Sequence, residues 1–230
     1  MTLAAPAVES IALPPARVHA RTGFAFRTLG HTDYAPCWRA MQAFTAARDA
    51  QTRDEIWLAE HPPVYTLGLA GRTAHVHDVG NVPVVRVDRG GQVTYHGPGQ
   101  LLAYVLFDLR RARVGVRTMV RALENAVIDL LGTFGVEACG RVDAPGVYVR
   151  RDGVEAKIAA LGLRIREGCS YHGLALNVDV EPGPFQRIDP CGHPGLAVTS
   201  LAGLGIRCTQ DDAGERLAAT IALRLRSASR

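Results

Sequence analysis

The sequence predicts a single α/β domain of the α+β type, in which a mixed, largely antiparallel sheet packs against helices. Three observations predict this fold class. Segments typical of strands outnumber helical segments, and many of them are joined by hairpin turns, as in antiparallel sheets. No stretch has the composition of a linker between domains. We therefore expect a loosely ordered arm over residues 1–20 and one domain over residues 21–230.

In the first half of the chain, short apolar segments alternate with turns rich in glycine and proline. A helix is expected from Asp33, because the apolar residues that follow recur at near-helical spacing and Pro36 fits its first turn. The apolar segments between the turns are typical of strands. We expect these strands at residues 24–26, 55–58, 64–68, 84–87 and 101–107.

Two further helices are expected in the second half. From about Thr118 the apolar residues share one helical face, and Gly135 supplies a stop signal. The last periodic segment, residues 211–225, predicts a terminal helix, for which Thr209 is a possible N-cap.

Between these helices the chain is expected to form a run of hairpin-connected strands. The dipeptide Asp152-Gly153 is a strong hairpin signal, with apolar strands on both sides of it at residues 147–149 and 157–163. A turn then leads to a third strand at residues 171–180.

Composition limits the class of protein. The chain is 47% hydrophobic and 21% charged, as in soluble globular proteins with a sizeable core. The formal net charge of +4 comes from dispersed arginines rather than a basic block, which suits an acidic protein partner and argues against nucleic acid. The apolar runs fall short of the roughly twenty residues of a membrane span, and the N-terminus lacks the pattern of a signal peptide.

Five widely spaced cysteines without a CxxC pair argue against a disulfide framework or a structural zinc site. Reduced thiols favour a cytoplasmic protein. Cys191, between Pro190 and Gly192 in a loop, is either an exposed nucleophile or a small buried hydrophobe. Cys169 follows a tight turn and is the competing candidate, although a structural role fits it equally well. The other three are expected in the core: Cys37, Cys139 and Cys208.

Lys157 is the single lysine of the chain and lies within an apolar strand. A lysine can lose its proton when it is partly desolvated, whereas an arginine cannot. Lys157 is therefore a candidate base or partner of a thiolate, and the alternative is an ordinary outward-facing lysine.

A glycine-rich stretch, RGGQVTYHGPG, precedes the apolar strand at residues 101–107. A loop joined to a core strand commonly presents a binding surface, and the alternative is an ordinary turn. The stretch matches neither the P-loop nor GxGxxG, so no nucleotide is implied by motif. Its Tyr95-His96-Gly97 recurs as Tyr171-His172-Gly173. The two triplets could line one cleft if their strands pair, or they could hold two hydrogen-bonded core histidines.

Four blocks of sequence together resemble one known family. They are, in chain order, RGGQVTYHGPGQLLAYVLFDL, GVEAKIAALGLRI, GCSYHGLALNV and IDPCGHPGLAVTSL. They are similar to the octanoyltransferases of lipoate biosynthesis, and the likeness extends from about residue 25 to residue 225. The resemblance implies the fold of the catalytic domains of biotin and lipoate protein ligases.

The resemblance also implies a reaction, without a cofactor or a metal. An octanoyl group passes from octanoyl-acyl carrier protein to a lysine of a lipoyl carrier domain, in 2-oxoacid dehydrogenase complexes or the glycine cleavage H protein. The family uses a cysteine acyl-thioester and a lysine that lowers the pKa of that thiol. Matched block by block, these two residues are Cys191 and Lys157. Both carrier proteins are expected to be acidic where they dock, which suits a basic chain.

The family's substrate-binding segments fall on three stretches of this sequence. Backbone donors in the first stretch, or near Gly192, could stabilise the tetrahedral oxyanion, and leucines of the other two could line a tunnel for the acyl chain. The residues are Arg89, Gly90, Gly91, Gln92, Val93, Thr94, Tyr95 and His96, then Ala160, Leu161 and Gly162, then Gly173, Leu174 and Ala175.

Two other functions stay open at this point. An ATP-dependent lipoate or biotin protein ligase on the same scaffold would use Lys157 to bind the acyl-adenylate and would leave Cys191 incidental. A non-catalytic module would bind carrier proteins without turnover.

Overall fold

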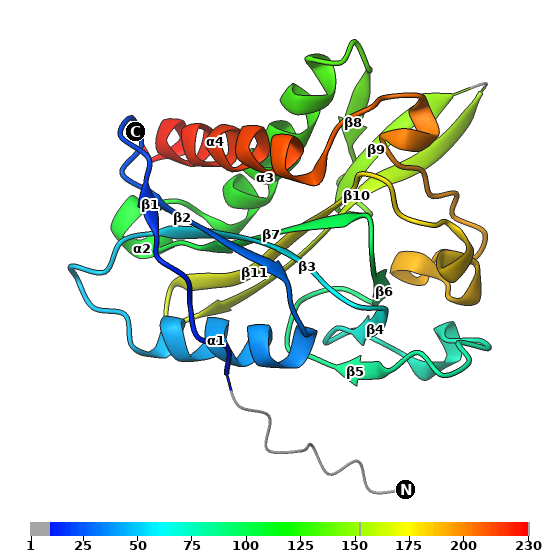
Figure 1. Cartoon of the computed structure of the whole chain (residues 1–230), viewed down its shortest axis with the longest axis horizontal. Coiled ribbons are helices and arrows are strands. Elements are labelled where there is room, and N and C mark those ends of the chain that lie inside the picture. The colour runs from blue at the N-terminus through cyan, green and yellow to red at the C-terminus, as the bar shows by residue number, and fades with distance from the viewer. Residues whose placement is uncertain (1–9, 152, 230) are drawn as a thin grey trace, which may run out of the picture.

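The computed structural model describes residues 10–151 and 153–229 and places a large sheet between two layers of helices (Figure 1). Every neighbouring pair in this sheet is antiparallel except β2 and β3. The predicted mixed, largely antiparallel sheet is therefore confirmed. Its order among the described residues is β1 (Arg17–Val18), β2 (Ala25–His31), β3 (Glu55–Glu60), β7 (Gln100–Leu106), β11 (Cys169–Asn177), β10 (Val154–Arg166), β9 (Gly146–Arg151) and β8 (Ala138–Gly140).

A second, smaller sheet lies beside the large one. Its order is β5 (Val84–Arg86), β4 (Val64–Leu67) and β6 (Val93–His96). Strand β6 falls inside the glycine-rich stretch that was interpreted as a loop. That interpretation was wrong here, because β6 consists of four consecutive residues without glycine, mostly of types that favour strands, and it pairs antiparallel with β4.

The three predicted long helices are present, and each begins within two residues of its expected start. They are α1 (Tyr34–Ala46), α3 (Val116–Gly132) and α4 (Gln210–Ala228); a short α2 (Leu109–Ala112) follows β7. Thr209 caps α4, since its side chain accepts a hydrogen bond from the backbone N–H of Asp212. None of the described helices is long and apolar enough to cross a membrane.

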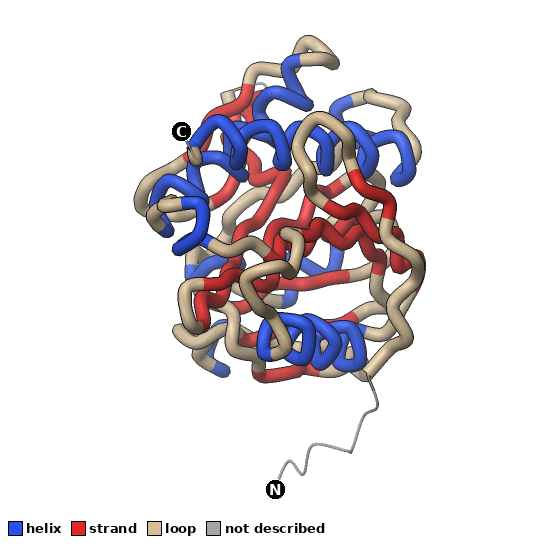
Figure 2. The backbone as a smooth tube through the Cα atoms, turned by 90° about the vertical axis from the view of Figure 1, so that its left-hand side faces the viewer, coloured by secondary structure: helices blue, strands red, loops and turns tan. Residues whose placement is uncertain are grey.

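Two cores pack on opposite faces of the large sheet. Helices α3 and α4 cover one face and α1 covers the other (Figures 1 and 2). In β7 alternate side chains enter different cores, Leu101 and Ala103 toward α3 and α4, Leu102 and Tyr104 toward α1. Burial on both faces explains why this strand is a continuous apolar run.

The expected N-terminal arm is attached to the domain over part of its length. Ile11 and Leu13 pack against the α1 core, and β1 pairs with β2. Residues 1–9 lie outside the described part of the chain.

The predicted run of hairpins is confirmed. Strands β9, β10 and β11 pair antiparallel in succession. Gly153, at the turn between β9 and β10, has a left-handed φ of 80°; Asp152 lies outside the described residues. The register of β9 against β10 shifts between Lys157 and Ala159.

Candidate active site

Lys157 and Cys191 meet although 34 residues separate them. The Nζ atom of Lys157 donates a hydrogen bond of 2.9 Å to Sγ of Cys191. Lys157 is only 3% exposed, so the alternative of an outward-facing lysine is wrong. The chain beyond Cys191 returns alongside β10, where the backbone N–H of Lys157 donates to Ala197 O and Thr199 N–H donates to Lys157 O. This pairing brings the loop with Cys191 to the strand with Lys157.

The surroundings of Lys157 stabilise its positive charge. Nζ also lies 3.3 Å from the carbonyl oxygen of Pro145 and 4.9 Å from the ring centre of Tyr148. Burial lowers the pKa of Lys157, but the attraction and hydrogen bond of Cys191, together with Tyr148, outweigh it, and the pKa is raised above its usual value. Lys157 is therefore an ammonium beside the sulfur and not a free base.

Cys191 lies in a tight 3₁₀ turn, η3 (Pro190–Gly192). Its φ is 59° and that of Gly192 is 77°, so two successive residues are left-handed. A residue with a Cβ avoids this conformation unless its surroundings enforce it. The thiol is partly exposed and lines the pocket described below.

The other cysteines lie in different settings. Cys169 is buried at the start of β11, and burial raises the pKa of its thiol. Cys37 is buried in the α1 core, where its pKa is raised to about 12. Cys139 was expected in the core, and this was wrong: it is exposed, because β8 is the edge of the sheet. Cys208 is partly exposed. None of these four is hydrogen-bonded to a lysine, the single lysine being Lys157.

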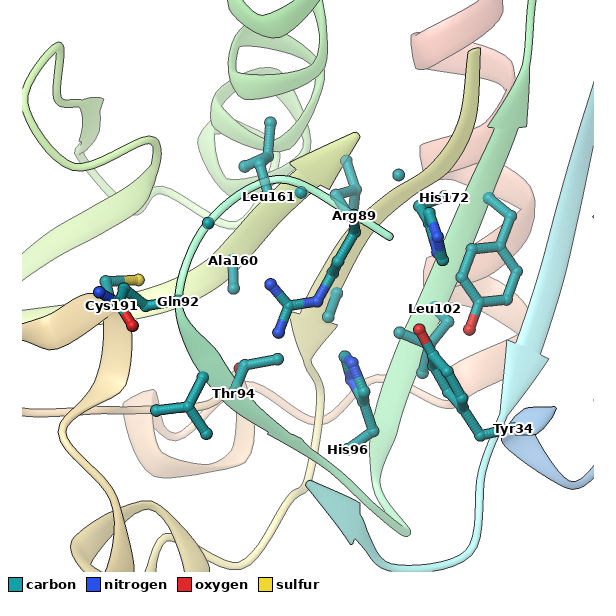
Figure 3. Close-up of a pocket in the computed structure, with 17 residues that line it drawn as sticks. Tyr34, Arg89, Gln92, Thr94, His96, Leu102, Ala160, Leu161, His172 and Cys191 are labelled. Carbon is teal, nitrogen blue, oxygen red and sulfur yellow. The ribbon is translucent and has the colours of Figure 1, made fainter. Parts of the chain in front are cut away.

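A pocket of about 500 Å³, including its open mouth, extends from Cys191 between the two sheets (Figure 3). Two of the expected substrate-binding segments form adjoining parts of its wall, because Ala160, Leu161 and Gly162 pair in register with Ala175, Leu174 and Gly173. The first segment supplies the opposite wall from the small sheet. The expected residues that line it are Arg89, Gly91, Gln92, Val93, Thr94, His96, Ala160, Leu161, Gly162, Gly173, Leu174 and Ala175.

Two expected residues do not line this pocket. Tyr95 points to the other side of β6, where its ring lies 5.4 Å from that of Phe185, because side chains alternate along a strand. Gly90 instead ties the loop to β10, since its N–H donates to Leu163 O. The pocket also contains residues outside the expected segments: Tyr34, Leu102, Tyr104 and His172. Only His172 had a local signal, the repeated triplet.

The backbone donors expected to stabilise an oxyanion are in part already used. Gly192 N–H donates to Asp189 O, His193 N–H donates to Pro190 O, and Gly90 N–H is taken by Leu163 O. These groups maintain the turns and are not free for a substrate.

Arg89 places a buried positive charge in the pocket. The residue is 7% exposed, and its guanidinium donates to Thr66 O at 2.7 Å, Thr66 Oγ1 at 2.8 Å and Gly90 O at 2.9 Å. Among the described residues no carboxylate pairs with it. Burial lowers the pKa of Arg89, and the nearby Tyr34 and Cys191 counteract this. An uncompensated buried cation attracts negative charge that develops nearby.

The two triplets do not pair as strands, because β6 belongs to the small sheet and β11 to the large one. Their histidines nevertheless line the same pocket (Figure 3). His96 Nδ1 lies 2.7 Å from Gln100 Oε1, and burial lowers the pKa of His96 to about 3. His172 Nε2 lies 2.8 Å from Asp88 Oδ1. Both are therefore hydrogen-bonded, buried histidines that also shape the pocket.

Comparison with known proteins supports one family. Residues 33–222 match the family described as the lipoyl protein ligase A/B catalytic domain. An octanoyltransferase of Methylococcus capsulatus is 64% identical over 183 residues, which is 80% of this chain and 86% of that protein. An octanoyltransferase of Thiobacillus denitrificans is 58% identical over 84% of this chain and 87% of that protein.

Solved structures agree on the fold. Lipoate-protein ligase A bound with ATP is similar with a TM-score of 0.70 and 15% identity, over 87% of this chain and 84% of that chain. The biotin protein ligase of Aquifex aeolicus is similar with a TM-score of 0.53 and 10% identity, over 89% of this chain and 70% of that one. The expected ligase-like fold is confirmed, and the chain belongs to the lipoyl protein ligase A/B catalytic domain family and, within it, to the octanoyltransferases.

Proposed function

We propose that this enzyme takes an octanoyl group from octanoyl-acyl carrier protein and transfers it to a lysine of a lipoyl carrier domain, through a thioester on Cys191. The observation that carries the proposal is the 2.9 Å hydrogen bond from Lys157 to the Cys191 sulfur, at one end of a pocket that has apolar residues of β10 and β11 in its wall. The acceptors would be lipoyl domains of 2-oxoacid dehydrogenase complexes and the glycine cleavage H protein, and the free cysteines suit a cytoplasmic setting.

The first half-reaction forms the acyl-enzyme. The Cys191 thiolate attacks the thioester carbonyl, a new carbon–sulfur bond forms, and the bond to the carrier's thiol breaks. The leaving thiolate takes up a proton. The Lys157 ammonium is buried and adjacent to the sulfur, so it attracts the negative charge of the attacking thiolate. The guanidinium of Arg89 adds positive charge to the same pocket, where charge develops on the carbonyl oxygen.

Acylation changes the balance at Lys157. Two of the interactions that raise its pKa come from Cys191, and a thioester sulfur no longer carries the negative charge. Burial still lowers the pKa of Lys157, but the interactions that stabilise its ammonium are then weaker than before acylation. Lys157 can therefore give its proton to the departing thiolate.

In the second half-reaction the neutral amine of the acceptor lysine attacks the thioester carbonyl, and the neutral Lys157 amine takes the proton that the attacking nitrogen loses. The amide C–N bond forms, the C–S bond to Cys191 breaks, and the Cys191 thiolate is restored beside the Lys157 ammonium.

Octanoylation of Cys191 provides the test. After incubation with octanoyl-acyl carrier protein, intact-mass spectrometry followed by peptide mapping should find one octanoyl group on Cys191. Cys191→Ser should lose transfer to a lipoyl domain, whereas Cys169→Ser and Cys139→Ser, which change a buried and an exposed thiol elsewhere, should retain it. An adduct on another residue, or transfer that survives Cys191→Ser, would contradict the proposal.

The ATP-dependent ligase makes a different prediction from the same fold. It would require ATP and free octanoate, and it would tolerate Cys191→Ser. The hydrogen bond from Lys157 to Cys191 favours the transferase, because Lys157 is directed at the sulfur. A carrier-binding module would bind its carriers unchanged after loss of both residues and would show no turnover.

A further inference from the structure

One segment outside the pocket holds the loop that carries Cys191. Residues 72–77, which include the 3₁₀ turn η1 (Thr73–His75), contribute no residue to the pocket wall. They nevertheless contact the chain just before Cys191. The carboxylate of Asp189 accepts from both histidines of this segment: His75 Nδ1 lies 2.9 Å from Oδ2, and His77 Nε2 lies 3.1 Å from Oδ1.

Backbone hydrogen bonds strengthen the same attachment. Asp189 N–H donates to His75 O at 3.0 Å, and His77 N–H donates to Arg187 O at 2.9 Å. Val76 and Ile188 form an antiparallel bridge between them. The residues that lead to Cys191 are therefore fixed to residues 75–77 through main chain and side chains together.

The same segment also supports the other side of the turn. The N–H of Arg72 donates to Oε1 of Gln92 at 3.1 Å. The Gln92 side chain lies against Gly192, since a Cβ on Gly192 would be 3.5 Å from its Cγ. Gln92 and Cys191 both line the pocket (Figure 3).

This attachment stabilises an unusual backbone conformation at Cys191. Cys191 has a left-handed φ of 59°, a conformation that costs free energy and persists only where the surroundings enforce it. Downstream, the chain is fixed by its pairing with Lys157. Upstream, Asp189 and residues 75–77 supply the fixed point. Asp189 and the two histidines contact one another through hydrogen bonds, and the described residues contain no group of three or more His, Cys, Asp or Glu arranged to hold a metal ion.

We propose that Asp189, held by His75 and His77, is a positioning residue that keeps Cys191 in its left-handed turn, with the sulfur aimed at Lys157. The inference rests on the proposed function of Cys191. We call the hydrogen bonds of Asp189 with His75 and His77 the clamp. Loss of the clamp should slow the chemical step while both carrier proteins still bind, because a displacement of about 1 Å at a nucleophile can cost on the order of 100-fold in rate.

The experiment compares Asp189→Ala, Asp189→Asn and His77→Ala with Asp129→Ala. Asp129 is a matched control, a carboxylate that accepts two hydrogen bonds from Arg224 between helices α3 and α4. We expect Asp189→Ala to lower kcat by roughly 100-fold with KM for both carriers within about twofold. Asp189→Asn should lose less, because the amide keeps one acceptor oxygen and its NH2 group can donate to a histidine ring nitrogen. The rate of Cys191 alkylation by iodoacetamide should fall in the same order.

Several outcomes would overturn the inference. One is a kcat for Asp189→Ala equal to that of Asp129→Ala; another is a loss that matches the unfolded fraction measured by thermal melting. If Asp189→Ala does not fold, His77→Ala decides, since His77 is half exposed and its change removes the hydrogen bond to Asp189. Additive losses in the double variant Asp189→Ala/His77→Ala would also contradict the clamp. Transfer that survives Cys191→Ser would reject the proposed function itself, whereas loss in Cys191→Ser with normal Asp189 variants would reject only the clamp.

Discussion

At the scale of single residues, the position of Lys157 depends on a glycine, Gly146, beside its side chain. The side chain of Lys157 passes directly over Gly146, whose φ of 152° is itself unusual for residues with a side chain. Gly146 N–H donates to the buried carboxylate of Glu124. The glycine leaves the space through which Lys157 reaches Cys191.

Gly146→Ala tests this passage. A Cβ at this position would lie 2.7 Å from Cε of Lys157 and 2.8 Å from Ala159 O, so Lys157 must move away from Cys191. We expect transfer to fall by on the order of 100-fold, measured as kcat for octanoyl transfer. Gly132→Ala is the control, because a Cβ there meets nothing within 4 Å. Normal kcat in Gly146→Ala would show that Lys157 does not depend on this space.

At the scale of elements, the pairing of β7 with β11 explains another glycine. Gly173 was expected to bind substrate, and it does line the pocket. It also faces the backbone of β7, since a Cβ would lie 2.0 Å from Ala103 O. The packing of strands alone therefore requires glycine at this position.

Gly173→Ala should accordingly destabilise the whole domain and not only the site. Overpacking in a close-packed interior typically costs about 1–3 kcal/mol, which urea unfolding of the free enzyme can measure. Gly183→Ala provides the comparison, because no atom lies within 4 Å of a Cβ there. Unchanged unfolding free energy in Gly173→Ala would mean that the strands separate readily at this point.

The elements also show how far local patterns can be taken. The terminal helix and the β9–β10–β11 hairpins were predictable because period, cap and turn signals are local. Strand β6 was missed because glycines flank it and its partner β4 lies far earlier in the chain. Tyr34, Leu102 and Tyr104 were missed as pocket residues because each also resembles an ordinary core residue.

At the scale of the whole molecule, buried histidines couple folding to pH. Burial lowers the pKa of His61 to about 4 and that of His96 to about 3. The unfolded chain, with histidine pKa values near 6.5, binds more protons than the folded one between these limits. The unfolding free energy should therefore be undiminished by these two histidines above pH 6.5 and should fall as the pH drops toward 4. The pKa of Asp88 is also lowered. Asp88 therefore reduces the unfolding free energy further only below about pH 4, the ordinary pKa of an aspartate.

His61→Gln should reduce this pH dependence. Each pKa unit of difference between the folded and unfolded states is worth about 1.4 kcal/mol, so the slope of unfolding free energy between pH 5 and pH 7 should flatten measurably. His193→Gln, at an exposed position, should leave the slope unchanged. Equal slopes in the wild type and His61→Gln would show that His61 titrates normally in the folded state.

The amino-acid sequence was sufficient to predict the fold class and the secondary structure of most segments, and it singled out Cys191 and Lys157 as the candidate reactive residues. Periodicity and turn signals act over a few residues, and Cys191 and Lys157 stand in distinctive local settings and in family blocks. The three-dimensional structure was needed to show that these two residues touch, which face of β6 enters the pocket, and that residues 75–77 contact the loop before Cys191. These are contacts between segments distant in the chain, and they depend on strand register and packing, which no local pattern encodes.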